Sequence, residues 1–172
     1  MSGCVLWVLR CNGISRFGTT SACPSISSYA GRICIGVFKR RIARYGYGGD
    51  CRCCLCAADE ESPSHLFFEC RYSSKCVQFV AAKMGINVPV SDTWNWWNQC
   101  RFPSLFHKKV IGAVLSAIIY RVWKARNHSL HNSMLIRPEI WMKSLLPELV
   151  FRCKSLVPPS ICNRYMSWLN NL

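Results

Sequence analysis

The feature that most constrains this chain is a group of metal-ligand residue types packed into 18 positions of its first half. The spacing is Cys-x2-Cys-x8-His-x4-Cys, formed by Cys53, Cys56, His65 and Cys70. Three thiolates and one imidazole fill the tetrahedral shell of Zn2+ and leave no open position, which is typical of a structural site. A segment this short cannot bury enough apolar surface to fold alone, so the metal would supply its folding free energy. We therefore predict one structural Zn2+ held by these four side chains.

Other polar residues compete with this assignment. Cys51 and Cys54 form a second Cys-x2-Cys pair interleaved with the first, and His128-x2-His131 is a distant alternative. Residues three apart share a helix face, but two solvated polar residues past a helix end are the simpler interpretation of these histidines. The cysteines could also be ordinary reduced thiols. The acidic run at 59–61 is most simply a solvated loop.

The charge balance limits the partners. The 172 residues include 22 Lys+Arg and 8 Asp+Glu, a formal net charge of +14 that favours a polyanion such as nucleic acid. The longest uncharged, largely apolar stretch, residues 110–120, is far shorter than the roughly 20 residues of a membrane span. A signal peptide has a basic residue before its apolar core, and no basic residue precedes the short apolar run at 4–9. We expect a reducing intracellular compartment, nucleus or cytoplasm, and no membrane partner.

The small number of acidic residues argues against catalysis. The chain has three Asp and five Glu, whereas two-metal polymerases and nucleases need several carboxylates that converge on the metals. It contains no Gly-rich phosphate loop, no Gly-x-Ser-x-Gly elbow and no His-Glu-x-x-His. We expect a binding protein rather than an enzyme.

The chain divides into three parts. Residues 1–38 show no hydrophobic period and form a poorly organised N-terminal segment. Residues 39–103 hold the metal-ligand segment, a following helix and a Trp-bearing linker, and residues 104–172 are a helical extension. We predict a small, mainly α fold, in which a zinc-stabilised knuckle with at most a short β-hairpin precedes the extension.

The helix ends carry recognisable signals. Ser73-Ser74 is an N-cap for a helix through Met84, which Gly85 ends. Pro103-Ser104 starts the clearest helix, over 104–128, where apolar residues recur at spacings of three and four. Pro138-Glu139 opens another helix, interrupted or restarted at Pro147, and Pro158-Pro159 stops it before a short tail.

A family resemblance rests on residues 53–70, which read Cys-Cys-Leu-Cys-Ala-Ala-Asp-Glu-Glu-Ser-Pro-Ser-His-Leu-Phe-Phe-Glu-Cys. This string closely resembles the zinc-binding module found after the reverse transcriptase in plant LINE-type (non-LTR) retrotransposons, whose pattern is C-x-x-C-G-x-x-E-E-[ST]-x-x-H-L-F-x-x-C. Residues 121–127 resemble the family's later helix end with its W-[RK]-x-R-N-like string, and the resemblance spans about residues 39–131. Ala57 stands where the family usually has Gly, and a left-handed turn there would cost Ala about 1–2 kcal/mol.

The resemblance implies a nucleic-acid-binding module, for RNA or single-stranded DNA, without polymerase or nuclease sites. Basic and aromatic residues suited to phosphates and stacked bases lie just before the knuckle: Lys39, Arg40, Arg41, Arg44 and Tyr45. Phe67 could present its ring to an unstacked base. The alternatives are a solvated helix face or targeting signal for the basic stretch, and core packing for Phe67.

Two other functions stay open. The zinc site could stabilise the fold of a protein-interaction module. Its apolar helix over 104–128 would then dock on a protein partner or a second copy. The chain could also be a residual retroelement copy with no selected function, which the unmatched N-terminal segment and Ala57 favour.

Overall fold

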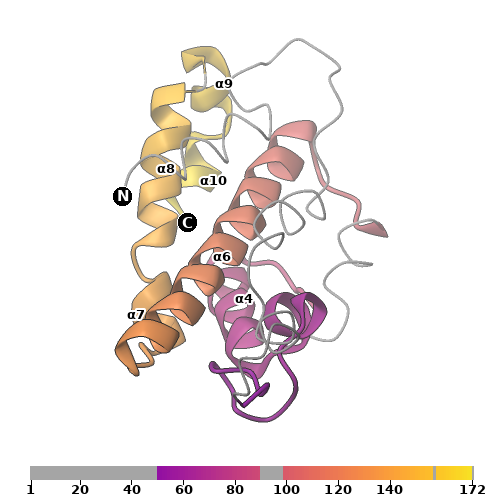
Figure 1. The fold of residues 1–172 in the computed structure, drawn as a ribbon. Coiled ribbons are helices and arrows are strands. Elements are labelled where there is room, and N and C mark those ends of the chain that lie inside the picture. Colours follow the sequence, from indigo (N-terminus) through magenta and orange to yellow (C-terminus); the bar gives the residue numbers. More distant parts are fainter. Residues whose placement is uncertain (1–49, 90–98, 157, 172) are drawn as a thin grey trace.

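A computed structural model of the chain describes residues 50–89, 99–156 and 158–171 (Figure 1). These residues are mainly helical, which confirms the predicted small, mainly α fold. In chain order they form the π-helix η1 (His65–Glu69) and the α-helices α4 (Arg71–Met84), α6 (Leu105–Asn132), α7 (Pro138–Met142), α8 (Leu145–Leu156), α9 (Pro159–Arg164) and α10 (Met166–Asn170). An isolated antiparallel bridge joins Arg52 to Glu60. The described residues contain no strand, so this bridge takes the place of the short hairpin that the sequence allowed.

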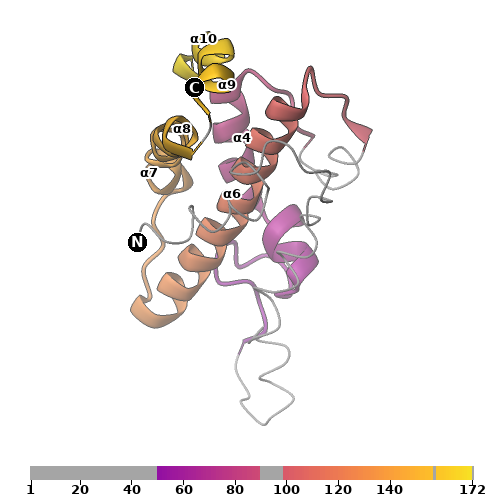
Figure 2. The ribbon, with the colours of Figure 1, turned by 90° about the horizontal axis from the view of Figure 1, so that it is seen from above.

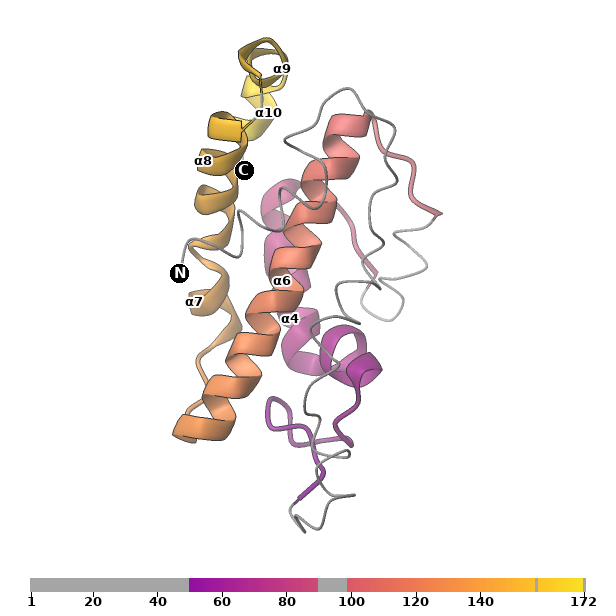
Figure 3. The same cartoon turned by 45° about the horizontal axis from the view of Figure 1, so that its top comes forward.

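The long helix α6 is the central element. It packs against α4, η1, α7 and α8, with α7 and α8 along one side of it, and α7 also packs directly against α4 (Figure 3). Every residue from 109 to 119 is buried, because neighbours cover more than one face of the helix. The predicted start is confirmed, since the Ser104 side chain accepts a hydrogen bond from the His107 backbone N–H at 3.3 Å. Its end at Asn132 lies beyond the predicted 128.

The helix α4 starts earlier than the sequence indicated. Its N-cap is Cys70, and Ser73 lies inside the first turn, where its buried hydroxyl donates to the carbonyl of Leu66. The expected N-cap at Ser73-Ser74 is therefore wrong, because the chain passes from η1 into α4 through one extended residue. The predicted end is confirmed: Gly85 has φ 64°, and the N–H of Ile86 donates to Ala81 at 3.0 Å.

The C-terminal part contains more helix than predicted. α7 opens at Pro138 as expected, and a turn at 143–144 separates it from α8. Pro158 precedes a new helix, α9, so the expected short tail forms α9 and α10, which lie together to one side of α8 (Figure 2). The Tyr165 ring between them stacks on Phe106 at the start of α6, with ring centroids 4.3 Å apart.

A single hydrophobic cluster joins the metal-ligand segment to the helices. It includes Cys53 and Leu66, the inward faces of α4 and α6, and Leu169 near the C-terminus. The described residues on both sides of position 103 therefore share one core. None of the helices described has the length and hydrophobicity that crossing a lipid bilayer requires. The Trp-bearing linker falls mostly on residues 90–98, outside the described residues.

Candidate metal centre

The first two candidate ligands lie in a tight turn that backbone hydrogen bonds close. The Cys53 N–H donates to the Asp59 carbonyl at 2.8 Å, and the Ala57 N–H donates back to the Cys53 carbonyl at 2.7 Å. Ala57 has φ 56°, which is the left-handed region. This is the turn for which the resemblance expects glycine, so Ala57 carries the backbone cost that the sequence predicted.

The other two candidate ligands lie at the start and just after the end of η1. The N–H of Cys70 donates to the carbonyl of His65 at 2.6 Å, five residues back, which defines a π-helical turn. That wider turn lets an x4 spacing return both side chains to the same side of the backbone. Leu66 and Phe67 between them are buried and anchor the turn in the core.

The four predicted ligands converge. We call Cys53, Cys56, His65 and Cys70 the Cys3His cluster; their ligand atoms all lie within 4.8 Å of one another. The sulfurs of Cys53 and Cys70 are 3.8 Å apart, and the sulfur of Cys56 is 3.2 Å from Nε2 of His65. Two thiolates on one tetrahedral Zn2+, each at about 2.3 Å, lie roughly 3.8 Å apart. The Cys3His cluster therefore could hold a metal ion.

Electrostatics favour thiolate at Cys53 and thiol at Cys70. The hydrogen bond from Cys70 lowers the pKa of Cys53 to about 5, against the opposing effect of burial. The same contact, together with burial, raises the pKa of Cys70, which therefore keeps its proton in the metal-free pair. A bound cation would replace that shared proton and stabilise both sulfurs as thiolates.

A carboxylate lies behind the histidine. Oδ2 of Asp59 is 3.8 Å from Nδ1 of His65, on the side of the ring opposite to the nitrogen that faces Cys56. This separation is longer than a hydrogen bond, and the Asp59 side chain is 71% exposed. Asp59 therefore agrees with the solvated loop that the sequence indicated, with its carboxylate near the imidazole.

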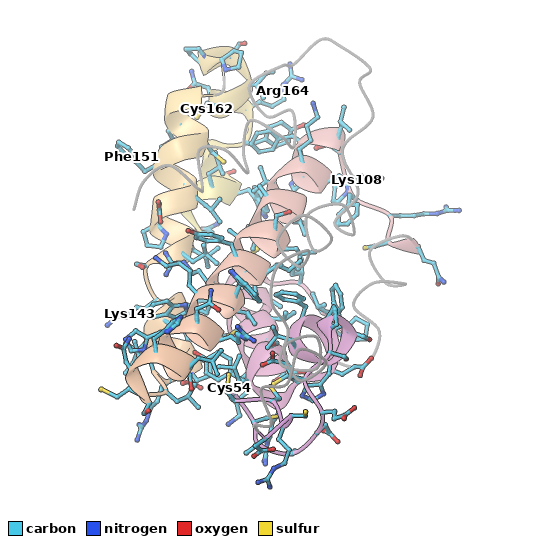
Figure 4. All side chains as sticks on the ribbon, viewed as in Figure 1. Cys54, Lys108, Lys143, Phe151, Cys162 and Arg164 are labelled. Carbon is cyan, nitrogen blue, oxygen red and sulfur yellow. The ribbon has the colours of Figure 1, made fainter. Side chains whose placement is uncertain are left out.

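The competing cysteines and histidines lie outside the cluster. The Cys54 sulfur is 3.7 Å from the carbonyl oxygen of Arg126, which places it against α6 (Figure 4). Cys51, His128 and His131 do not join any group of metal-ligand side chains among the described residues. The two histidines lie in the last turns of α6 rather than past its end, and Nδ1 of His128 contacts the Met134 carbonyl at 3.2 Å.

A buried ion pair fastens the metal-ligand segment to α6, and the sequence analysis missed it. Both oxygens of Glu61 accept hydrogen bonds from Arg126, at 2.5 and 3.2 Å, and neither residue is more than 4% exposed. The interpretation of Glu61 as part of a solvated loop is therefore wrong. Glu61 and Arg126 each belong to one of the two sequence strings that carry the family resemblance. That shared membership was the sequence signal that could have predicted their pairing.

Of the residues predicted to contact nucleic acid, the structure describes only Phe67. Phe67 is only 3% exposed and packs in the core, edge-on to Phe68 at 6.4 Å, so it is not available to stack on a base. That assignment is corrected, because η1 turns this ring inward. The basic and aromatic residues Lys39, Arg40, Arg41, Arg44 and Tyr45 lie outside the described residues and stay a prediction.

Comparison of the chain with protein-family models, with curated proteins and with solved structures finds no match. Function is therefore inferred from the residues of this chain.

Proposed function

We propose that the Cys3His cluster binds one structural Zn2+ and that the chain is a nucleic-acid-binding module related to those of LINE-type retrotransposons. The observation that carries the zinc proposal is the convergence of four soft and borderline ligand atoms within 4.8 Å. Four protein ligands leave no position open for substrate, which supports a structural role rather than metal catalysis.

The ion would act by fixing the loop. Residues 51–61 have one antiparallel bridge and a strained turn at Ala57, and the ion would add to the backbone hydrogen bonds and the Glu61–Arg126 pair that hold the loop. Zinc binding contributes on the order of 10 kcal/mol in small zinc-dependent peptides. Here Cys53 and Cys70 also belong to the shared core, so the loop and the helices are stabilised together. Three thiolate ligands require a reducing compartment, which supports the nucleus or cytoplasm as the location.

The nucleic-acid proposal rests on charge and on the resemblance. The formal net charge of +14 on 172 residues favours a polyanionic partner. Binding through phosphates weakens steeply with salt, because cations condensed on the nucleic acid are released.

The test uses the full chain, loaded with one equivalent of zinc, and a fluorescein-labelled single-stranded RNA. We expect the association constant to fall by at least tenfold between about 50 and 200 mM salt. Removing zinc with a chelator lowers binding further. A flat salt dependence, or the same affinity with and without zinc, contradicts the proposal. A matched single-stranded DNA distinguishes the two nucleic acids.

A protein partner is the second candidate function. The apolar residues of α6 that would dock on it, such as Val114 and Ile118, are buried within this chain. Exposed apolar side chains instead lie in the last turn of α6 and just after its C-terminal end: Leu130, Met134 and Leu135. If these dock on a second copy, the purified chain sediments as a dimer and Met134→Ser makes it a monomer.

A further inference from the structure

The outward side of α7 and α8 carries a row of exposed side chains. We call Lys143, Pro147, Phe151 and Lys154 the α7–α8 strip. Lys143 keeps helical backbone angles (φ −53°, ψ −35°), and the N–H of Glu148 donates to the Ser144 carbonyl at 3.3 Å. The helical course therefore continues across the turn, and spacings of four, four and three residues align the strip on one face.

Phe151 stands at the centre of this strip and is 69% exposed. The opposite face of α8 supplies core residues, including Leu145, Leu149 and Cys153, each 1% exposed or less. Phe151 therefore points away from the core, and Figure 4 shows it and Lys143 on the side of α7 and α8 that faces away from α6. A single exposed ring is ordinary on a protein surface, so the inference depends on what surrounds it.

The charges around Phe151 are positive. Lys143 and Lys154 are both exposed, and Nζ of Lys154 donates to Oδ1 of Asn170 at 3.0 Å, which holds that ammonium group near α10. Glu148, the acidic residue of α8, turns to α6, where its carboxylate pairs with Arg121 at 3.3 Å.

Glu139, the acidic residue of α7, is exposed and lies twelve residues before Phe151. On α4, burial foremost and the Glu139 charge in addition raise the pKa of Tyr72 and of Cys76. Of the two acidic residues, Glu148 is therefore paired with α6, and Glu139 lies at the far end of α7 from Phe151.

We propose that the α7–α8 strip binds single-stranded nucleic acid, with a base stacked on Phe151 and phosphates beside Lys143 and Lys154. The inference rests on the proposed nucleic-acid function and gives it a surface. Single-strand binding sites combine an aromatic face, which any base can use, with lysines that neutralise the backbone. With Phe67 buried, Phe151 supplies that aromatic face.

The strip fits a nucleic acid better than a lipid bilayer. Membrane-surface helices bury a continuous apolar face in the headgroup region. Among the residues whose exposure the structure describes, the next large exposed apolar residue along α7 and α8 is Ile140, eleven residues before Phe151 and about 16 Å away along a helix. Isolated apolar side chains at that separation give little buried area, whereas stacking needs one ring.

The experiment measures binding of a fluorescein-labelled single-stranded RNA of about 16 nucleotides to the zinc-loaded full chain. Phe151→Leu keeps an apolar side chain but removes the aromatic face, and we expect it to weaken binding about 5- to 100-fold. Phe151→Tyr keeps the face and the affinity. Lys143→Ala reduces the slope of log affinity against log salt by about 0.7. The matched controls are Leu105→Ala and Lys108→Ala, which alter exposed residues at the start of α6.

The outcomes separate the two proposals. If the wild-type chain binds RNA with the expected salt dependence but Phe151→Leu binds equally well, the strip is refuted and the proposed function stands. If the wild-type chain does not bind RNA, both fail. Vesicles of phosphatidylserine and phosphatidylcholine supply the third arm, and binding to vesicles without binding to RNA overturns the strip in favour of a membrane surface. Because Phe151 is exposed, all variants should melt at the wild-type temperature.

Discussion

The carboxylate of Glu61 and the guanidinium of Arg126 form a two-point ion pair across 65 residues of chain, with both side chains almost completely buried. The Arg126 guanidinium also lies 5.1 Å from the centre of the Trp123 ring. The pair joins the loop that carries Cys53 and Cys56 to the central helix. Its loss should therefore affect the loop and α6 together.

Glu61→Gln and Arg126→Met should each destabilise the fold. Removing one partner leaves a buried charge without compensation, which costs about 3–5 kcal/mol. Denaturant unfolding of the zinc-loaded chain measures the effect. The double variant Glu61→Leu/Arg126→Met should be more stable than the sum of the single losses implies, because it leaves no unpaired charge. A single-variant loss below about 1 kcal/mol would show that the pair is dispensable.

Ala57→Gly should stabilise the protein. With φ at 56°, Ala57 has a left-handed backbone that glycine adopts without steric cost, and we expect a gain of about 1 kcal/mol in the free energy of unfolding. Ala58→Gly is the matched control, since Ala58 is exposed and lies outside the left-handed region. It should be neutral or slightly destabilising, and an equal gain at both positions would argue against backbone strain.

The buried thiol of Cys76 should make stability fall at alkaline pH. Burial, foremost, raises the pKa of Cys76 from 9.0 to about 12. Between these values the folded chain keeps the proton that the unfolded chain releases. The free energy of unfolding therefore falls as pH rises from about 9 to 12, by at most about 1.4 kcal/mol per pH unit for one thiol.

Denaturant unfolding at several pH values checks this dependence. Cys76→Ala should show a shallower fall than the wild type, and identical slopes would rule out a contribution from this thiol. In the native protein iodoacetamide should label Cys76 far more slowly than the partly exposed Cys100, because the reactive thiolate is scarce and covered.

The convergence of the four residues of the Cys3His cluster could be predicted from the sequence because the spacing of candidate metal ligands is a local feature. A Cys-x2-Cys turn and a His-x4-Cys return are local features, and four ligands within 18 residues leave few other arrangements. The helix ends at Gly85 and Ser104 were predicted for the same local reason, since each satisfies backbone groups beside it.

The features that the sequence analysis missed depend on tertiary contacts. Nothing in the acidic run at 59–61 distinguishes buried Glu61 from exposed Glu60 until α6 brings Arg126 to it. Phe67 and Phe68 are likewise equivalent in sequence, and only the π-helical turn of η1 decides which of them is buried. The start of α4 was misplaced because Cys70, rather than a serine, occupies its N-cap position.

The most direct test of the account is the number of zinc ions that native mass spectrometry finds on the purified chain and on two cysteine variants. Cys53→Ser removes a member of the Cys3His cluster, whereas Cys51→Ser changes a cysteine two positions away that lies outside it. We predict one Zn2+ on the wild type and on Cys51→Ser, and none on Cys53→Ser. A wild-type chain without zinc, or equal zinc on both variants, would contradict the account.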